Sequence, residues 1–270
     1  MTDRLAGRAC LVTGSTGIAA AAATRLAAEG ARIFVVSRTA AHADALAARI
    51  RAAGGTADAM AADLTDETEV EDAVAGCVKA CGRIDGLLSV AGGSGRRFGD
   101  GPIHELTAEG WDRTIELNLR SQALVSREVV RRMLDQEPLD RGARGAIVLV
   151  SSVLAAHPVP ELFATHAYAA AKGAIVSLAL AMAAAYARNG IRVNVLAAGL
   201  TDTPMAARAA GDPMAVEFAT RKQPLAGGFL DADDVAAAAV YLLSDESRAM
   251  TGQVLAVDGG WSVTSASPGS

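Results

Sequence analysis

The sequence predicts an α/β protein with a parallel seven-stranded sheet and helices on both faces. Three observations lead to this prediction. Short β-branched runs alternate with long stretches rich in alanine and leucine. The runs are continuously apolar, as expected of strands that are buried on both faces of a parallel sheet. No linker or internal repeat divides the 270 residues. The expected architecture is a doubly wound (Rossmann) single domain over 1–262, with a flexible tail over 263–270.

The elements follow from the same alternation. Strands are expected at 9–13, 31–36, 56–64, 84–90, 145–151, 190–196 and 252–258. Helices are expected near 17–29, 40–53, 66–81, 108–136, 166–188 and 232–243.

Composition excludes several classes of function. The net charge of −5 and the pI of about 5.4 argue against a nucleic-acid surface. No signal-like segment opens the chain and no apolar run has the length of a membrane span, so a cytoplasmic protein acting on a small molecule is expected. Cys10, Cys77 and Cys81 are expected to be buried free thiols, and no metal site is predicted.

The segment LVTGSTGIAAAAA, residues 11–23, has the character of a dinucleotide-binding turn. Gly14 directly follows the first strand and would permit a tight turn, while Gly17 would leave bare backbone beside the phosphates. Ala19 takes the place of the third glycine. The amides of residues 17–19 would point the positive end of the helix dipole at the ligand.

The second strand ends in Ser37 and Arg38 rather than in an acidic residue. An Arg at this position favours a 2′-phosphate, whereas NAD sites commonly carry Asp or Glu there. NADP(H) is therefore the preferred cofactor, with NAD(H) as the alternative and a solvated Arg38 as the simpler interpretation. Asp63 and Leu64 follow the third strand at the expected adenine edge, although Asp63 also fits a helix N-cap.

The strongest catalytic signal is HAYAAAKGA, in which Tyr168 precedes Lys172 by four residues on an expected helix. This spacing puts both side chains on one helix face. An ammonium close to a phenol favours the phenolate and lowers its pKa, which would let Tyr168 exchange a proton with a carbonyl or an alkoxide. A surface helical pair is the simpler alternative.

With these motifs, residues 5–262 resemble the short-chain dehydrogenase/reductase family. The likeness extends to VSSV (150–153), ELNLRS (116–121), VNVLAAGLTDTPM (193–205) and TGQVLAVDGGW (251–261). The family implies a hydride transfer between a nicotinamide cofactor and a carbonyl or secondary alcohol. It also implies a homotetramer or homodimer, assembled through the helices at 108–136 and 166–188.

The resemblance assigns roles residue by residue. Tyr168 would be the general acid or base, Lys172 would bind the nicotinamide ribose and lower the pKa of Tyr168, and Ser152 would stabilise charge on the substrate oxygen. Asn118 would anchor a water at a local break in its helix, and Thr203 would meet the carboxamide. The expected cofactor-binding residues are Gly14, Ser15, Thr16, Gly17, Ile18, Ser37, Arg38, Asp63, Leu64, Ala91, Gly92, Tyr168, Lys172, Gly199, Thr201 and Thr203.

Four features depart from the family pattern. The glycine turn is one residue short, Ser89-Val90-Ala91-Gly92 replaces an Asn-Asn-Ala-Gly, and Ala198-Gly199 replaces a Pro-Gly. Sixteen residues separate Ser152 from Tyr168, whereas about thirteen are usual. Ser151 is thus a rival to Ser152. The inserted residues bring His157 and His166 near the expected pocket, although loop histidines are more often structural.

Two segments are expected to border the substrate. Residues 201–229 are predicted to form a mobile lid, and 92–102 the opposite rim, where Arg96 and Arg97 either attract an acidic substrate or are simply solvated. The lid side chains expected to make the pocket apolar are Met205, Met214, Phe218, Leu225 and Phe229.

The predicted function is NADP(H)-dependent reduction of a hydrophobic ketone or 3-oxoacyl compound. The alternatives are an NAD-dependent alcohol dehydrogenase that works oxidatively and a catalytically impaired dinucleotide-binding sensor or scaffold.

Overall fold

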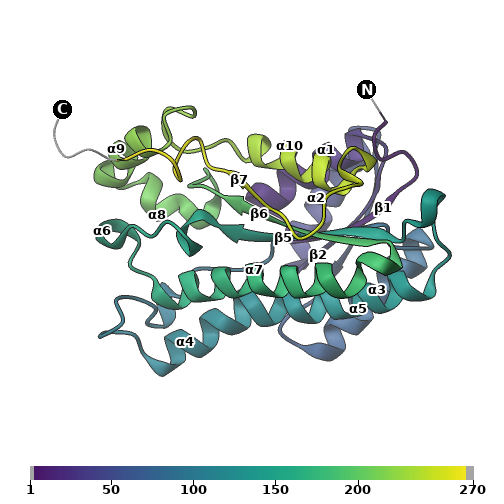
Figure 1. Ribbon diagram of the computed structural model, residues 1–270, viewed down its shortest axis with the longest axis horizontal. Helices are drawn as coiled ribbons and strands as arrows, with labels where there is room; N and C mark the ends of the chain where they lie inside the picture. The colour runs from purple at the N-terminus through teal and green to yellow at the C-terminus, as the bar shows by residue number, and fades with distance from the viewer. Residues whose placement is uncertain (1–2, 266–270) are drawn as a thin grey trace.

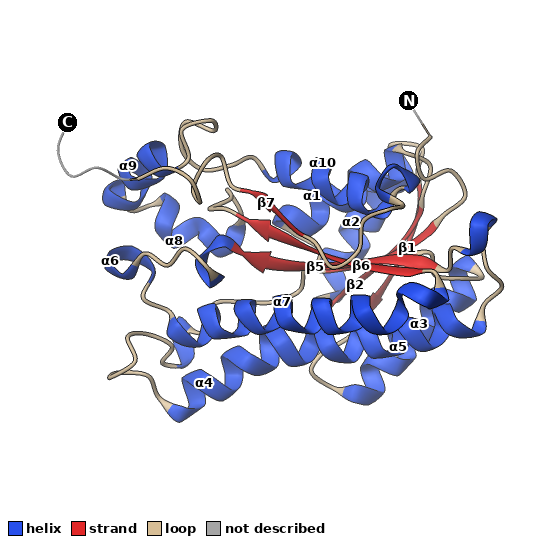
Figure 2. Cartoon of the chain, viewed as in Figure 1, coloured by secondary structure: helices blue, strands red, loops and turns tan. Residues whose placement is uncertain are grey.

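Seven parallel strands form one twisted sheet in the computed structural model, which describes residues 3–265 (Figures 1 and 2). Their order across the sheet is β3-β2-β1-β4-β5-β6-β7. The strands are β1 (Ala9–Thr13), β2 (Arg32–Ser37), β3 (Thr56–Ala61), β4 (Gly86–Ser89), β5 (Gly145–Ser152), β6 (Ile191–Ala198) and β7 (Val254–Val257). The order reverses between β1 and β4, which is the switch point where ligands bind in open α/β sheets.

Helices cover both faces, as predicted (Figure 1). On one face lie α1 (Gly17–Ala28), α2 (Ala40–Ala52) and α10 (Ala232–Leu243). On the other lie α3 (Glu67–Cys81), α5 (Ser121–Asp135) and α7 (His166–Tyr186). Each face buries its own apolar cluster, in which alanine and valine predominate because the helices lie close to the strands.

The helix predicted at 108–136 is divided into three parts. It consists of α4 (Ala108–Ile115), a π-helical turn over Glu116–Arg120 and α5. This widened turn is the local break expected around Asn118, and such turns are common at functional sites.

Short helices lie beyond the carboxyl ends of the strands. They are α6 (Pro160–Phe163), α8 (Ala207–Ala210) and α9 (Pro213–Lys222). The last two belong to the expected lid over 201–229, whose mobility stays a prediction. Of the expected tail, 263–265 are described and Thr264 donates a hydrogen bond to the Lys222 carbonyl at 2.8 Å, whereas 266–270 lie outside the described residues.

The segment His166–Asn189, which contains α7, is long and apolar enough to cross a membrane by length and composition, with a mean hydropathy of 1.6. In the fold it lies against β5 and β6, and Ile175 and Ala179 on it are buried in the core. Packing on the sheet explains part of this apolar composition, since 39% of the apolar window is buried.

Candidate active site

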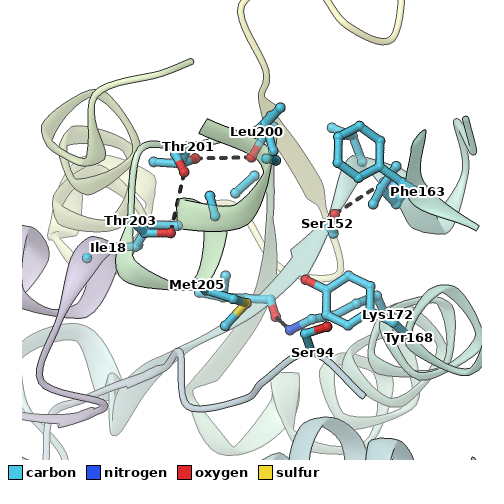
Figure 3. Close-up of a pocket in the computed structure, with 18 of the residues that line it drawn as sticks. Ile18, Ser94, Ser152, Phe163, Tyr168, Lys172, Leu200, Thr201, Thr203 and Met205 are labelled. Atoms are coloured by element: carbon cyan, nitrogen blue, oxygen red, sulfur yellow. Dashed lines mark hydrogen bonds between the residues drawn. The ribbon is translucent and has the colours of Figure 1, made fainter. Parts of the chain in front are cut away.

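A cavity of about 430 Å3 opens at the carboxyl ends of β5 and β6. Ser152, Tyr168 and Lys172 line it together, and Figure 3 shows the Tyr168 hydroxyl directed into the same space as Ser152. Thr203 and Ile18 lie on the side nearer to α1. The fold thus brings the predicted catalytic triplet to one surface that adjoins the glycine turn.

The two adjacent serines at the end of β5 have different partners. The Ser151 hydroxyl donates to the main-chain oxygen of Lys172 at 2.7 Å, which joins the strand to α7. The Ser152 hydroxyl accepts a hydrogen bond from the Leu154 amide at 3.2 Å and also interacts with the Tyr168 hydroxyl. This arrangement favours Ser152 over Ser151 as the residue that meets a substrate oxygen.

The first turn of α7 positions Tyr168 through a carboxylate from a different part of the chain. Asp100 is buried, with 4% of its surface exposed. Its Oδ1 accepts from the Ala167 amide and its Oδ2 from the Tyr168 amide, both at 3.0 Å. A carboxylate is stabilising at a helix N-terminus because it satisfies free amides and matches the helix dipole. Asp100 thus fixes the backbone that carries the phenol.

Burial dominates the ionisation of both catalytic side chains. It raises the pKa of Tyr168 to about 12, and the hydrogen bond with Ser152 acts in the opposite direction. Burial also lowers the pKa of Lys172 to about 8. The Lys172 ammonium lies 5.5 Å from the centre of the Tyr168 ring and donates to the Val150 carbonyl at 2.9 Å. The expected lowering of the Tyr168 pKa by Lys172 is therefore wrong for this structure, in which burial determines the direction of the shift.

Asn118 does not line the cavity but lies behind it, fully buried in the π-helical turn. Its Oδ1 accepts from the Gly93 amide at 3.2 Å, and its Nδ2 donates to the Gly93 and Thr114 carbonyls at 2.9 Å each. In this structure the side chain fixes the loop after β4 to the helix. Its expected role in holding a water stays a prediction.

The shortened glycine turn keeps two glycines in the positive-φ region. Gly14 and Gly17 have φ of 97° and 52°, which only glycine adopts readily. A Cβ at Gly17 would lie 2.6 Å from the Thr203 Cγ2, so the turn approaches the lid closely. Thr16, the N-cap of α1, makes no side-chain capping bond, and the first turn of the helix has no acidic residue. These features fit a dinucleotide pyrophosphate.

The residues expected near the adenosine lie at or just after the ends of β2 and β3, outside the lining of the cavity. Ser15 donates to the Ser37 hydroxyl at 2.9 Å, and Arg38 is exposed. The charge of Arg38 contributes to the lowered pKa of Asp63, after the hydrogen bonds from Thr65. The N-cap interpretation of Asp63 is wrong, because the cap of α3 is Asp66.

The segment after β4 is held without the family's asparagines. The Thr13 hydroxyl accepts from the amides of Val90 and Ala91 at 3.0 and 3.1 Å. A Cβ at Gly92 would lie 2.6 Å from the Asn118 Oδ1, which explains the glycine. Val90 and Ala91 are thus held through their main-chain amides. Of the other expected cofactor residues, Gly199 and Thr201 line the cavity. Leu64 does not, because it is buried in the core beneath α3.

The insertion between Ser152 and Tyr168 builds an apolar wall. Phe163 packs on Trp261, with ring centres 6.1 Å apart. The Trp261 Nε1 donates to the His157 carbonyl at 3.2 Å, and the His166 ring bonds the Gly101 carbonyl at 2.9 Å. Neither histidine lines the cavity.

The prediction that lid side chains make the pocket apolar is only partly correct. Met205 lines the cavity, and Phe218 packs on Trp261 from outside it. Met214, on α9, and Leu225, beyond the end of that helix, are exposed by 70% and 89% and do not line the cavity, nor does Phe229. Three residues that sequence reasoning missed are Asp100, Trp261 and Arg208. Asp100 and Trp261 approach the site only through long-range contacts, and no local sequence pattern indicates that they belong to it.

Comparisons with known proteins agree with this geometry. Residues 12–262 match a family model described as Enoyl-(Acyl carrier protein) reductase. An inactive 2-(S)-hydroxypropyl-CoM dehydrogenase 2 of Xanthobacter autotrophicus is 38% identical over 86% of this chain and 95% of its own. The cis-4-hydroxycyclohexanecarboxylate dehydrogenase of Sinomonas cyclohexanicum is 36% identical over 97% of this chain and 99% of its own.

A solved structure also resembles this chain in fold and in sequence. A Beutenbergia cavernae protein assigned as an NAD(P)-dependent gluconate 5-dehydrogenase, solved with NADP at low occupancy, superposes with a TM-score of 0.85. It is 34% identical over 98% of this chain and 100% of its own. Within 3–265, no group of three or more His, Cys, Asp or Glu side chains is placed to hold a metal ion.

Proposed function

The chain belongs to the short-chain dehydrogenase/reductase family of NAD(P)-dependent oxidoreductases, and from this premise we propose that it transfers a hydride between NADP(H) and a carbonyl or secondary alcohol. The observation that carries the proposal is the convergence of Ser152, Tyr168 and Lys172 on one cavity that continues to the glycine turn. The relatives described above are named for hydroxy compounds, which supports a secondary alcohol or its ketone as substrate.

The mechanism assigns one task to each side chain. A nicotinamide cofactor supplies or accepts the hydride when it is bound. In reduction, the Tyr168 phenol donates its proton to the substrate oxygen, and its raised pKa keeps that proton available at neutral pH. The Ser152 hydroxyl donates a hydrogen bond to the same oxygen as negative charge develops there. In oxidation, the base would be the Tyr168 phenolate, so the phenol must lose its own proton before it accepts that of the alcohol.

Lys172 has two tasks in this proposal. Its ammonium binds ribose hydroxyls at the nicotinamide end, and it places a positive charge beside the phenol. Because burial lowers the pKa of Lys172 to about 8, this charge is lost as the pH rises above that value. Thr16, Gly17 and Ile18 would hold the pyrophosphate, and Thr203 the carboxamide.

The preference for NADP(H) rests on Arg38. This side chain is exposed at the end of β2, and among the described residues it forms no ion pair that would occupy it. An arginine fork suits a 2′-phosphate, which NADP carries and NAD lacks. We further propose a cytoplasmic homotetramer or homodimer.

The test is a titration with NADPH and NADH, followed by nicotinamide fluorescence and thermal shift. Arg38→Gln should weaken NADPH binding about tenfold or more and leave NADH unchanged, because a charge-assisted hydrogen bond contributes roughly 1.5–3 kcal/mol. Arg49→Gln removes an exposed arginine from the same region, on α2, and should change neither affinity.

The other outcomes of the cofactor titration would favour one of the two alternative functions. Tighter NADH binding in the parent protein would replace the NADP(H) proposal with the NAD-dependent dehydrogenase. Binding of neither cofactor would mean that the shortened glycine turn is disabling, and the sensor or scaffold would then be favoured. The relative named as inactive gives that second alternative a specific basis.

A further inference from the structure

We infer that the substrate carries an anionic group, which Arg96 and Arg208 bind together at the solvent-facing part of the cavity. Both side chains line the cavity and both are exposed. The inference deepens the proposed function and rests on it, since it names the class of substrate that the same site accepts.

The cavity is positively charged although the chain is not. Its described lining contains Arg96, Arg97, Lys172 and Arg208 but no aspartate or glutamate. The whole chain has a net charge of −5. Positive charge in a cleft with apolar walls attracts anions and raises their local concentration.

The charges of Arg96 and Arg208 influence each other, and the buried carboxylate of Asp100 offsets the charge of Arg96 only in part. Neither forms an ion pair with a carboxylate that the structure describes. Burial lowers the pKa of Arg96, the charge of Arg208 lowers it further, and the carboxylate of Asp100 raises it by less. Two like charges thus face the same space, and an anion between them would relieve the repulsion.

The two arginines come from the two segments expected to border the substrate, the rim and the lid. Arg96 belongs to the 3-10 turn Arg96–Phe98 on the rim, where it donates to the Leu162 carbonyl at 3.2 Å. Arg208 belongs to α8, within the lid. An anion bound by both arginines would link the lid to the rim and hold the substrate under the lid. Arg97 stacks on Phe98 at 4.5 Å and adds a third charge nearby.

Apolar side chains also line the cavity. Leu154, Phe163, Met205 and Trp261 are among them, and Figure 3 shows Phe163 and Met205 on different sides of the Tyr168 hydroxyl. The site therefore fits a carbonyl compound with an apolar body, whose oxygen meets Tyr168 and whose acid group meets the arginines. Carboxylate and sulfonate share the chemistry that an arginine pair recognises.

The experiment compares matched ketones. The probes are 4-oxocyclohexanecarboxylate, its neutral carboxamide and 4-oxocyclohexanesulfonate, assayed for kcat/KM with NADPH and for binding by quenching of tryptophan fluorescence, since Trp261 lines the cavity. We expect both anions to exceed the carboxamide by about tenfold to a hundredfold, and added salt to narrow the difference. The better of the two anions identifies the acid group.

Two variants test whether Arg96 and Arg208 bind the acid group of the substrate. Arg96→Gln and Arg208→Gln should each reduce kcat/KM for the anions at least tenfold and leave the carboxamide unchanged. Arg221→Gln is the matched control, because Arg221 lies on α9 in the same lid and pairs with Glu217 at 3.1 Å outside the cavity. It should behave as the parent protein does.

Three results would overturn the inference. Equal kcat/KM and equal binding for anions and carboxamide would exclude an anion site while leaving the oxidoreductase proposal intact. Equal losses for all three ketones in the arginine variants, with weaker NADPH binding, would mean that the arginines bind the cofactor. If none of the three ketones is turned over, the proposed function gains no support, and a carboxylate that binds no more tightly than the carboxamide in the fluorescence titration overturns the inference.

Discussion

The N-termini of α1 and α7 both point at the catalytic cavity. In α7 a side chain of the protein accepts hydrogen bonds from the first amides, so this helix is called closed, whereas α1 has no such acceptor among the residues that the structure describes and is called open. The carboxylate of Asp100 accepts from the first amides of α7, including that of Tyr168. At α1, Thr16 makes no side-chain cap and no acidic residue occupies the first turn. Every helix leaves free amides at its N-terminus, so this difference needs an explanation.

The difference shows which helix serves the chemistry and which serves a ligand. The backbone of α7 must stay fixed because it carries the proton donor, and a buried carboxylate achieves this. The N-terminus of α1 stays open because a phosphate would supply the negative charge there. An open end lowers the stability of the free protein, and ligand binding would restore it. The comparison can be tested from either helix.

The largest effect is expected at the functional group that α7 presents. Tyr168→Phe removes the proton donor and keeps the ring, so turnover should fall about 10²–10⁴-fold. Dinucleotide affinity should change little, because the turn at α1 is untouched. Steady-state kinetics and an NADPH titration measure the two quantities. Turnover close to that of the parent protein would contradict the assigned mechanism.

A charge at the open helix is the next largest change. Thr16→Asp should cap α1 and raise the free energy of unfolding by about 0.5 kcal/mol. The same carboxylate should weaken NADPH binding about tenfold to a hundredfold through repulsion of the phosphates. Thr107→Asp is the control, because it adds the same charge at the N-cap of α4, where an acceptor for the Gly110 amide is already in place. Unchanged NADPH affinity in Thr16→Asp would show that α1 does not hold the pyrophosphate.

Removal of the cap from the closed helix tests the other half of the comparison. Asp100→Ala leaves the Ala167 and Tyr168 amides without their acceptors and should cost about 1–3 kcal/mol in unfolding free energy. Asp100→Asn retains one acceptor oxygen and should recover part of both stability and kcat. A purely structural role would lower stability in Asp100→Ala without a change in kcat per folded molecule, which active-site titration would reveal.

Sequence reasoning predicted the sheet and the long helices because alternation of apolar strands and alanine-rich helices is a local pattern. Tyr168 and Lys172 were predictable for the same reason, since one helical turn fixes their spacing. Asp100 was not, because it reaches α7 from 67 residues away through a fold that must first exist. Arg208 lies in a helix of four residues, too short to leave a periodic signal.

The ionisation of Tyr168 shows a second limit. The Tyr-Lys spacing predicted a lowered pKa for the phenol, but the structure raises it, because desolvation depends on every residue packed around the ring. Spacing gives the distance between two groups and says nothing of the solvent around them. The same burial explains why Lys172, rather than Tyr168, has a pKa near the physiological range.

The smallest expected effect is a gain in stability at Lys172. Burial lowers its pKa from 10.5 to about 8, so the charged form destabilises the folded state. Between these two values the unfolded chain binds more protons than the folded one, and the stability of the parent protein therefore rises with pH in that window. Lys172→Met removes the buried charge but also the hydrogen bond to the Val150 carbonyl, which partly offsets the gain.

The net gain at pH 7 is expected to be about 1 kcal/mol, or a rise in Tm of roughly 2–4 °C for a chain of this size. The gain should shrink as the pH rises from 8 toward 10.5, because the lysine of the parent protein then becomes neutral. Thermal unfolding of both proteins at pH 7 and pH 10 measures this. A gain that is equal at the two pH values would mean that packing, rather than charge, distinguishes the variant, and that the ammonium of Lys172 is not held in the folded protein at a cost in stability.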